Sequence, residues 1–347
     1  MEEIYSNINE NGVATVTLNN PKALNSINLN MVQLLHKQLK EWENNDEIKL
    51  IIMEGSGDRA FSAGGDIKSL YTANVDEKVK QGAVQFFNEE YVLDAYIAQY
   101  PKPIIANLDG IVMGGGVGLA YHADYRIVSE KTKWAMPEMN LGFFPDVGAG
   151  YFLNKAPGYV GRYLALTGNI INGKEAIYIN AADYLLHSDN IANTIEKIHT
   201  TNWADKDVRS TLTKLFEAAQ NSSILENNLA THETSIEQHF NKDSVEEILA
   251  SLNTDPSEFA KETKEVIAAK SPVSVKVTLE QLIRCKNKSL EAVLDIDKIL
   301  ATNFLDHNDF YEGVRSVLID KDKQPNYHYD SLEKVSKTFV NSFFTLK

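Results

Sequence analysis

Two glycine-rich turns, each downstream of an apolar stretch, constrain this chain more than any other feature of its sequence. The first turn (residues 64–66, Gly-Gly-Asp) follows apolar residues 50–53, and the second (residues 114–116, all glycine) follows apolar residues 103–106. Short apolar stretches bounded by turns predict buried strands. Glycine lets a ligand approach the backbone closely because no Cβ blocks it, although a lone triple glycine also suits a tight turn.

The presence of two such turns favours a binding function over a purely structural one. The first N–H groups of a helix have no internal acceptor and can hold an anion or an oxyanion. Two converging N–H donors form an oxyanion hole, and the loss of one donor costs about 3–4 kcal/mol of reaction barrier. The candidate donors are the backbone N–H groups of Gly65 and Gly115.

The order of the predicted elements indicates an α/β fold. Asn11-Gly12 predicts a hairpin between two short strands near the N-terminus, and Asn28 is a candidate cap for the helix that follows. Strands, glycine turns and helices then recur as ββα units up to about residue 190, after which the patterns predict helices alone. We expect a core over residues 1–190 and a helical C-terminal region, residues 191–347, that packs on it.

Composition excludes several classes of function. The chain of 347 residues has a formal net charge of −14, which argues against nucleic acid as the main partner. No apolar run is long enough to predict a transmembrane helix. The single cysteine, Cys285, suits a reducing compartment, and the N-terminus lacks a signal or transit pattern. We therefore expect a cytoplasmic protein, unless a presequence has been removed, with no membrane partner.

Two carboxylates follow the second glycine turn. Glu138 comes at the end of a predicted strand, and Asp146 follows a proline eight residues later. A solvated side chain is the alternative for Glu138, and a helix N-cap is the alternative for Asp146. In a shielded site, however, two neighbouring carboxyl groups can have separated pKa values, so that one is ionised and the other protonated. No metal site is predicted, because His232, Glu233 and His239 do not have the spacing of a zinc motif.

The motifs FSAGGDI (residues 61–67), GIVMGGGVGLA (110–120) and AMPE (135–138) together resemble the crotonase (enoyl-CoA hydratase/isomerase) superfamily. The resemblance implies a crotonase-like fold of stacked ββα units that binds an acyl-CoA thioester. It assigns the oxyanion hole to Gly65 and Gly115, and it requires no separate cofactor, because coenzyme A is part of the substrate. Crotonases often form trimers or hexamers, so a homo-oligomer is one expectation. The alternative is that the helical end covers the site of its own chain.

The resemblance also implies residues that bind the substrate. Lys22 and Leu24 correspond to the segment that lies along the CoA nucleotide, although an exposed lysine is the simpler outcome for Lys22. Glu90, the second acid of a Glu-Glu-Tyr motif, corresponds to a position near the ligand, and a solvated face is its alternative. The remaining candidates flank the glycine turns or a short hydroxyacyl group: Ala63, Gly64, Asp66, Ile67, Gly114, Phe143 and Phe144.

Departures from the hydratase pattern indicate the type of reaction. Hydratases carry a glutamate two residues after the triple glycine, where this chain has Gly118, and a small residue where it has Asp146. This exchange resembles the 3-hydroxyisobutyryl-CoA hydrolase subfamily of valine catabolism. The subfamily motifs E-E-Y, F-P-D-V-G and E-G-V-R-x-x-L-I-D-K-D also occur, at residues 89–91, 144–148 and 312–322.

The implied activity is therefore hydrolysis of a short 3-hydroxyacyl-CoA thioester. Glu138 would activate water or attack the thioester directly, and Asp146 would bind the substrate 3-hydroxyl or share in proton transfer. An enoyl-CoA hydratase or isomerase and a non-catalytic acyl-CoA-binding protein are the alternatives. The sequence leaves the acyl group open, since 3-hydroxypropionyl-CoA would suit the same chemistry.

Overall fold

The computed structural model of the protein describes residues 2–221 and 225–346. The chain forms two compact units, and each is assembled from segments that are far apart in the sequence. The first consists of Met1–Gly65, Val92–Trp134 and Ile171–Asn227, and the second of Asp66–Tyr91, Ala135–Ile170 and Asn228–Lys347. The boundary expected at residue 190 falls inside the first unit. Packing of the chain beyond residue 227 on the predicted core stays a prediction.

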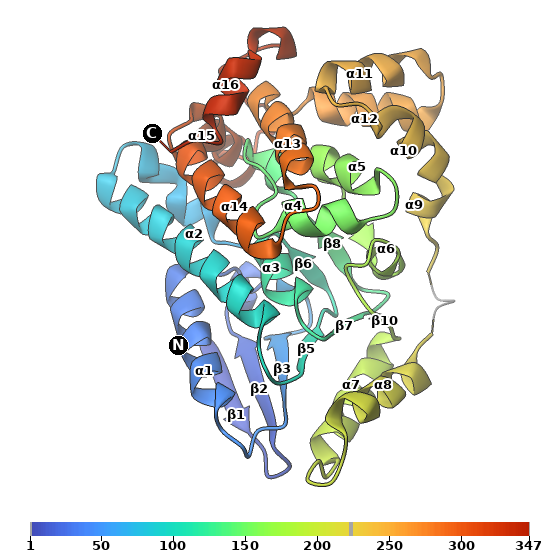
Figure 1. Ribbon diagram of the computed structural model, residues 1–347. Coiled ribbons are helices and arrows are strands. Elements are labelled where there is room, and N and C mark those ends of the chain that lie inside the picture. The colour runs from blue at the N-terminus through green and yellow to red at the C-terminus, as the bar shows by residue number, and fades with distance from the viewer. Residues whose placement is uncertain (1, 222–224, 347) are drawn as a thin grey trace. The chain divides into compact units, whose positions relative to one another are not determined.

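Within the described residues, the first unit contains a six-stranded sheet in the order β1-β2-β3-β5-β7-β10 (Figure 1). Its strands are β1 (Ile4–Ile8), β2 (Val13–Leu18), β3 (Leu50–Gly55), β5 (Ile104–Asn107), β7 (Tyr125–Val128) and β10 (Tyr184–Leu185). The pair β1–β2 is antiparallel, as the Asn-Gly hairpin predicts, and each later pairing is parallel. Parallel strands that are buried on both faces read as continuous apolar runs, which explains why residues 50–53 and 104–106 are uniformly apolar.

A second sheet has the order β4-β6-β8-β9 in the described residues. Its strands are β4 (Ala60–Ser62), β6 (Ile111–Met113), β8 (Lys133–Ala135) and β9 (Ile171–Asn172). Strands β4 and β6 are parallel neighbours, and each leads directly into one of the two glycine turns. Because the carboxyl ends of parallel strands meet at one edge of a sheet, this pairing brings the two turns together.

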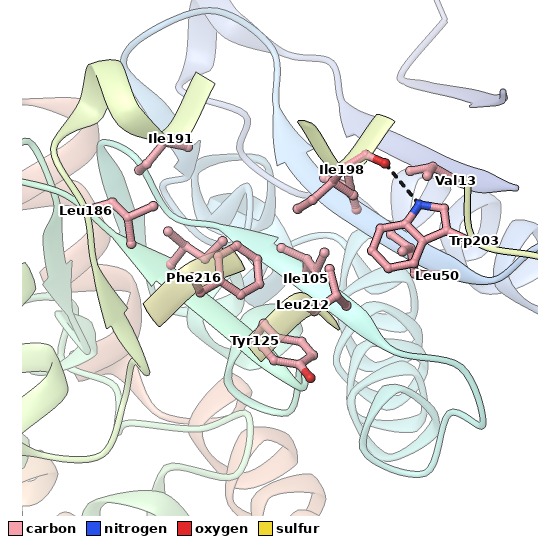
Figure 2. Close-up of a cluster of buried hydrophobic side chains, with 12 residues drawn as sticks. Val13, Leu50, Ile105, Tyr125, Leu186, Ile191, Ile198, Trp203, Leu212 and Phe216 are labelled. Carbon is pink, nitrogen blue, oxygen red and sulfur yellow. Dashed lines mark hydrogen bonds between the residues drawn. The ribbon is translucent and has the colours of Figure 1, made fainter. Parts of the chain in front are cut away.

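Helices α7 (Ser188–Thr200) and α8 (Val208–Ala219) of the first unit pack on the six-stranded sheet (Figure 2). Trp203 and Phe216 are buried against Leu50 and Ile105 of the sheet. The Trp203 indole Nε1–H also donates a hydrogen bond to the Ile198 carbonyl oxygen at 3.0 Å, which satisfies its polar atom inside the apolar cluster. The other helices that lie wholly in the described residues of this unit are η1 (Pro21–Ala23), α1 (Leu29–Glu43), α3 (Gly115–Tyr121) and α6 (Gly173–Tyr178). The Asn28 side chain caps α1 as predicted, since it accepts a hydrogen bond from the Met31 N–H.

The second unit is mainly helical. Helix α2 (Glu77–Ala98) contains the boundary between the units, at residues 91 and 92. The remaining helices are η2 (Ile67–Asn74), η3 (Glu138–Leu141), α4 (Ala149–Phe152), η4 (Leu153–Lys155), α5 (Val160–Thr167), α9 (Asn228–Thr231), α10 (Glu233–Phe240), α11 (Val245–Thr254), α12 (Glu258–Ala268), α13 (Pro272–Cys285), α14 (Leu290–Leu305), α15 (Asn308–Val314), η5 (Arg315–Ile319), η6 (Leu332–Lys334) and α16 (Lys337–Ser342). The predicted helical C-terminal part is confirmed, because no strand follows residue 190 in the described residues.

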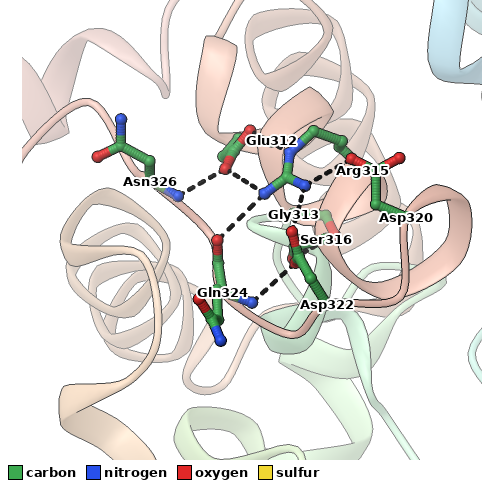
Figure 3. A network of polar contacts seen from close by, with 8 residues as sticks. All are labelled: Glu312, Gly313, Arg315, Ser316, Asp320, Asp322, Gln324 and Asn326. Carbon is green, nitrogen blue, oxygen red and sulfur yellow. Dashed lines mark hydrogen bonds and ion pairs between the residues drawn. The ribbon is translucent and has the colours of Figure 1, made fainter.

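The E-G-V-R motif takes part in a network of hydrogen bonds and ion pairs around Arg315 in the second unit (Figure 3). The Arg315 guanidinium donates to the Glu312 carboxylate within its own helical segment and to the carboxylates of Asp320 and Asp322, at 2.6–2.9 Å. It also donates to the Gln324 carbonyl oxygen at 3.1 Å. These contacts fix the segment after the last long helices, and they explain this part of the motif in structural terms.

Candidate active site

The two glycine turns lie against each other in the first unit. Gly64 has a φ of +96°, and a Cβ at this position would lie 2.9 Å from the Met113 carbonyl oxygen and 3.3 Å from the Gly115 nitrogen. Any side chain at Gly64 would therefore displace the backbone of the second turn. Gly116 likewise allows helix α3 to lie close to strand β4, because a Cβ at this position would lie only 2.8 Å from Ser62.

The N–H groups of Gly65 and Gly115 are available to a ligand. Gly115 is the first residue of α3, so its N–H has no partner within that helix. Within residues 2–221 and 225–346, the protein supplies no hydrogen-bond acceptor for either N–H. Their assignment as oxyanion donors stays a prediction, but the structure brings together the two turns that it requires.

The segment with Lys22 and Leu24 runs beside the first glycine turn. The Ala63 N–H donates to the Leu24 carbonyl oxygen at 2.9 Å, and the Ile27 N–H donates to the Gly64 carbonyl oxygen at 2.9 Å. Lys22 is exposed in a short helical turn, whereas Leu24 is half-buried with a φ of +53°. The structure therefore ties this proposed CoA-binding segment to the candidate oxyanion turn.

Glu138 and Asp146 are both buried in the second unit, with 7% and 5% of their surface exposed. Glu138 begins η3 directly after Pro137, and its Oε2 has no hydrogen-bond partner among the described residues. The Oδ2 atom of Asp146 accepts a hydrogen bond from the Tyr91 hydroxyl at 2.7 Å. Neither alternative for these residues holds, since Glu138 is not solvated and Gly148, not Asp146, occupies the N-cap position of α4.

Burial raises the pKa of both carboxyl groups. Burial raises the pKa of Glu138 well above its ordinary value, and the negative charge of Asp146 raises it further. Burial also raises the pKa of Asp146, but the Tyr91 hydroxyl partly offsets that rise because it donates to the ionised form. Two neighbouring carboxyl groups with raised pKa values can hold or exchange a proton near neutral pH, which is a property that acid–base chemistry uses.

The other predicted binding residues have mixed environments. Phe143 and Phe144 are buried, and Phe143 stacks on Phe87 with ring centroids 5.4 Å apart. Glu90 is buried next to Tyr91 in α2, so its solvated alternative does not hold. The remaining candidates are partly or fully buried at the glycine turns: Ala63, Gly64, Asp66, Ile67 and Gly114. Their contacts with a substrate stay predictions.

A third buried carboxyl group, Asp297, was not predicted from the sequence. Its Oδ2 accepts a hydrogen bond from the Gly148 N–H at 2.9 Å, and its Oδ1 accepts one from the Gln281 Nε2 at 2.9 Å. Burial raises the pKa of Asp297 well above its ordinary value, these two donors oppose the rise, and the charge of Asp146 adds to it. The available signal was an acid at a core position of the apolar helix α14, where a buried charge is costly.

No metal site is evident in the described part of the chain, where no group of three or more His, Cys, Asp or Glu side chains is arranged to hold an ion. None of the helices found in these residues is long and apolar enough to cross a membrane.

Comparison with known proteins identifies the class. The chain matches the family described as Enoyl-CoA hydratase/isomerase over residues 13–344, and it belongs to that family. It is 40% identical to the protein named 3-hydroxyisobutyryl-CoA hydrolase, mitochondrial, of Xenopus laevis, covering 95% of this chain and 86% of the relative. The protein of the same name from Homo sapiens is 39% identical, covering 95% of this chain and 85% of the relative.

A solved structure confirms the predicted fold. A carnitinyl-CoA dehydratase from Mycobacterium thermoresistibile superimposes with a TM-score of 0.92 at 34% identity, covering 100% of this chain and 97% of the other. The crotonase-like fold inferred from the glycine motifs is therefore correct.

The expected cytoplasmic location is contradicted. The two relatives described above are both named as mitochondrial proteins. The error has a physical reason, since a low cysteine count reports the redox state of a compartment and does not identify the compartment.

Proposed function

We propose that the protein hydrolyses the thioester of 3-hydroxyisobutyryl-CoA, or of a similar short 3-hydroxyacyl-CoA, to the free acid and CoA, as a step of valine catabolism. The buried pair of Glu138 and Asp146 carries this proposal, together with the named relatives at 38–40% identity over nearly the whole chain. Hydrolysis needs an oxyanion site and one group that activates water or attacks the thioester.

The N–H groups of Gly65 and Gly115 are the proposed donors to the thioester oxygen. As the carbonyl carbon becomes tetrahedral, negative charge develops on this oxygen, and two positioned N–H groups stabilise it most at that moment. The segment with Lys22 and Leu24, which is hydrogen-bonded to the first turn, would carry the CoA nucleotide.

Glu138 is the proposed nucleophile or general base. Either its carboxylate takes a proton from water while the water oxygen bonds to the carbonyl carbon, or it attacks that carbon itself and water then cleaves the resulting anhydride. In both routes the C–S bond breaks and the CoA sulfur leaves as a thiolate, which takes up a proton. Glu138 must be ionised before either route can begin.

Asp146 is the proposed partner in orientation and proton transfer. Its carboxylate, held by the Tyr91 hydroxyl, can accept a hydrogen bond from the substrate 3-hydroxyl or receive the proton that Glu138 gives up. Because CoA arrives with the substrate, we expect no separate cofactor, and dialysis against a chelator should leave turnover unchanged.

The main alternative is a hydratase or dehydratase, which the likeness to the carnitinyl-CoA dehydratase favours. Against it, the position that carries a second acid in hydratases is Gly118, buried within α3. A non-catalytic acyl-CoA-binding protein is less well supported, because relatives that match nearly the whole chain are named as hydrolases.

Release of free thiol from 3-hydroxyisobutyryl-CoA, measured with a thiol-reactive dye beside the ultraviolet absorbance of crotonyl-CoA, tests the proposal. We expect rapid thiol release and no change in crotonyl-CoA. Loss of the enoyl absorbance without free thiol would support the hydratase alternative. No change in either assay would indicate a different acyl group or a binding protein, and 3-hydroxypropionyl-CoA would then be the next substrate to test.

Sedimentation would distinguish the proposed homo-oligomer from a monomer.

A further inference from the structure

The loop that carries Asp146 has an unfavourable backbone conformation. Val147, directly after Asp146, has a φ of +48°, and Gly148 has a φ of +83°. A β-branched residue rarely adopts a positive φ, because its side chain crowds the backbone there. Such a conformation persists only where its surroundings hold it, and conformations of this kind cluster at functional sites.

Two buried side chains hold this loop at both ends. At its start, the Gln281 Nε2 donates to the Pro145 carbonyl oxygen at 2.9 Å. At its end, the Gly148 N–H donates to the Asp297 carboxylate at 2.9 Å, and Gln281 also donates to that carboxylate at 2.9 Å. Gln281 comes from α13 and Asp297 from α14, and both helices pack against α4, which follows the loop (Figure 1).

Fold stability alone does not explain a carboxyl group and an amide at these positions. Both side chains are fully buried in helices whose other inward residues are mainly apolar. Replacing a buried pair of hydrogen-bonding groups by apolar groups of the same shape can be nearly neutral or stabilising for a fold. The contacts of Asp297 and Gln281 are also directed at one short backbone segment, residues 145–148, that contains the proposed catalytic Asp146.

We infer that Asp297 and Gln281 are positioning residues, which lock the Pro145–Gly148 loop so that the Asp146 carboxylate is presented in one orientation for hydrolysis. This inference rests on the proposed function of Asp146. The Tyr91 hydroxyl fixes the carboxylate itself, whereas Gln281 and Asp297 fix the backbone that bears it. A positioning role affects the reacting geometry and leaves binding of the CoA moiety unchanged.

Substitution of the two residues tests the inference, with kcat and KM for 3-hydroxyisobutyryl-CoA measured separately. Asp297→Leu removes the acceptor for the Gly148 N–H, and we expect kcat to fall between about tenfold and a hundredfold, with KM within about twofold. Asp297→Asn keeps one acceptor oxygen for Gly148 and should retain more activity than the leucine variant. Gln281→Met, which is similar in shape, should lower kcat in the same way.

Asn303→Leu is the matched control. Asn303 is also buried in α14, but its side chain donates to the carbonyl oxygens of Phe343 and Thr345 near the C-terminus. We expect this variant to keep its kcat. Hydrogen exchange of a peptide spanning residues 145–150 gives a readout independent of turnover, and exchange should be faster in Asp297→Leu and unchanged in Asn303→Leu.

Each outcome decides the inference. An unchanged kcat in Gln281→Met, which removes the donor to Pro145, overturns it, even if Asp297→Leu does not fold. Equal losses of kcat and thermal stability in the Asp297 and Asn303 variants also overturn it, because they would indicate general damage to α14. If Asp146→Asn itself keeps full turnover, the proposed function of Asp146 fails instead, while the exchange result still shows whether Asp297 holds the loop.

Discussion

The glycine turns of the first unit and the Asp146 loop of the second unit offer different kinds of chemistry and depend on the chain in different ways. The turns present backbone N–H groups, and their geometry follows from parallel pairing of β4 with β6 and from the absence of side chains. The loop presents the Asp146 carboxyl group, which accepts a hydrogen bond from Tyr91, and its backbone is hydrogen-bonded to Gln281 and Asp297. The backbone site is thus specified by short motifs and one strand pairing, whereas the side-chain site also involves contacts from helices far away in the sequence.

The largest effect should come from removing the carboxylate chemistry itself. Glu138→Gln keeps the volume of the side chain but removes the nucleophile or base, so we expect kcat to fall by about a thousandfold or more. Asp146→Asn should lose most turnover as well, and both variants should still bind CoA, as titration calorimetry would show. Glu41→Gln, an exposed substitution on α1, is the control. Turnover near the normal rate in Glu138→Gln would remove this residue from the mechanism.

The next effect should come from the backbone site. Gly64→Ala introduces a Cβ that would lie 3.3 Å from the Gly115 nitrogen, at a φ of +96°. Displacing one oxyanion donor costs about 3–4 kcal/mol, so kcat should fall by about a hundredfold to a thousandfold.

Gly82→Ala is the matched control for this glycine substitution. Gly82 lies in α2, and a Cβ there has no neighbour within 4 Å. We expect normal kcat and a free energy of unfolding raised by about 0.5–1 kcal/mol, measured by denaturant titration, because alanine favours the helix. Equal activity of the two glycine variants would argue against an oxyanion site at this turn.

A smaller loss should follow from releasing Asp146 from its hydrogen bond. Tyr91→Phe keeps the ring and removes the hydroxyl that donates to Asp146. A hydrogen bond to a buried charged group contributes about 1.5–3 kcal/mol, so we expect kcat to fall by about tenfold to a hundredfold with little change in KM. Tyr311→Phe, which removes a buried hydroxyl that donates to the Leu305 carbonyl oxygen, is a control. Equal kinetic effects in the two variants would contradict a specific role for Tyr91.

The most gradual change should be in the pH dependence of kcat. On the acid side of the profile, kcat should fall by about tenfold for each pH unit. Glu138 must be ionised to act, and burial together with Asp146 raises its pKa. Activity is therefore present above the raised pKa and is lost as pH falls through it, so the acid limb of kcat should lie above the usual carboxyl range of about 4. A profile that stays flat down to about pH 4 would contradict the shielded carboxyl pair.

The sequence predicted the backbone features better than the side-chain partners. The apolar strands at residues 50–53 and 104–106 and the Asn28 cap follow from local patterns, and the structure contains them. Glu138 and Asp146 were candidates because they stand in short motifs. Asp297 was not a candidate, because its contact with Gly148 joins residues 149 positions apart in the sequence. A local sequence pattern cannot predict a contact over such a separation.

The fate of water oxygen tests the central claim most directly. The reaction would be run on 3-hydroxyisobutyryl-CoA in oxygen-18 water, and mass spectrometry would locate the label in the product. Hydrolysis by the Glu138–Asp146 pair predicts label in the carboxyl group of the released acid and an unlabelled 3-hydroxyl. Label at the 3-hydroxyl, with the thioester intact, would contradict the account and identify a hydratase.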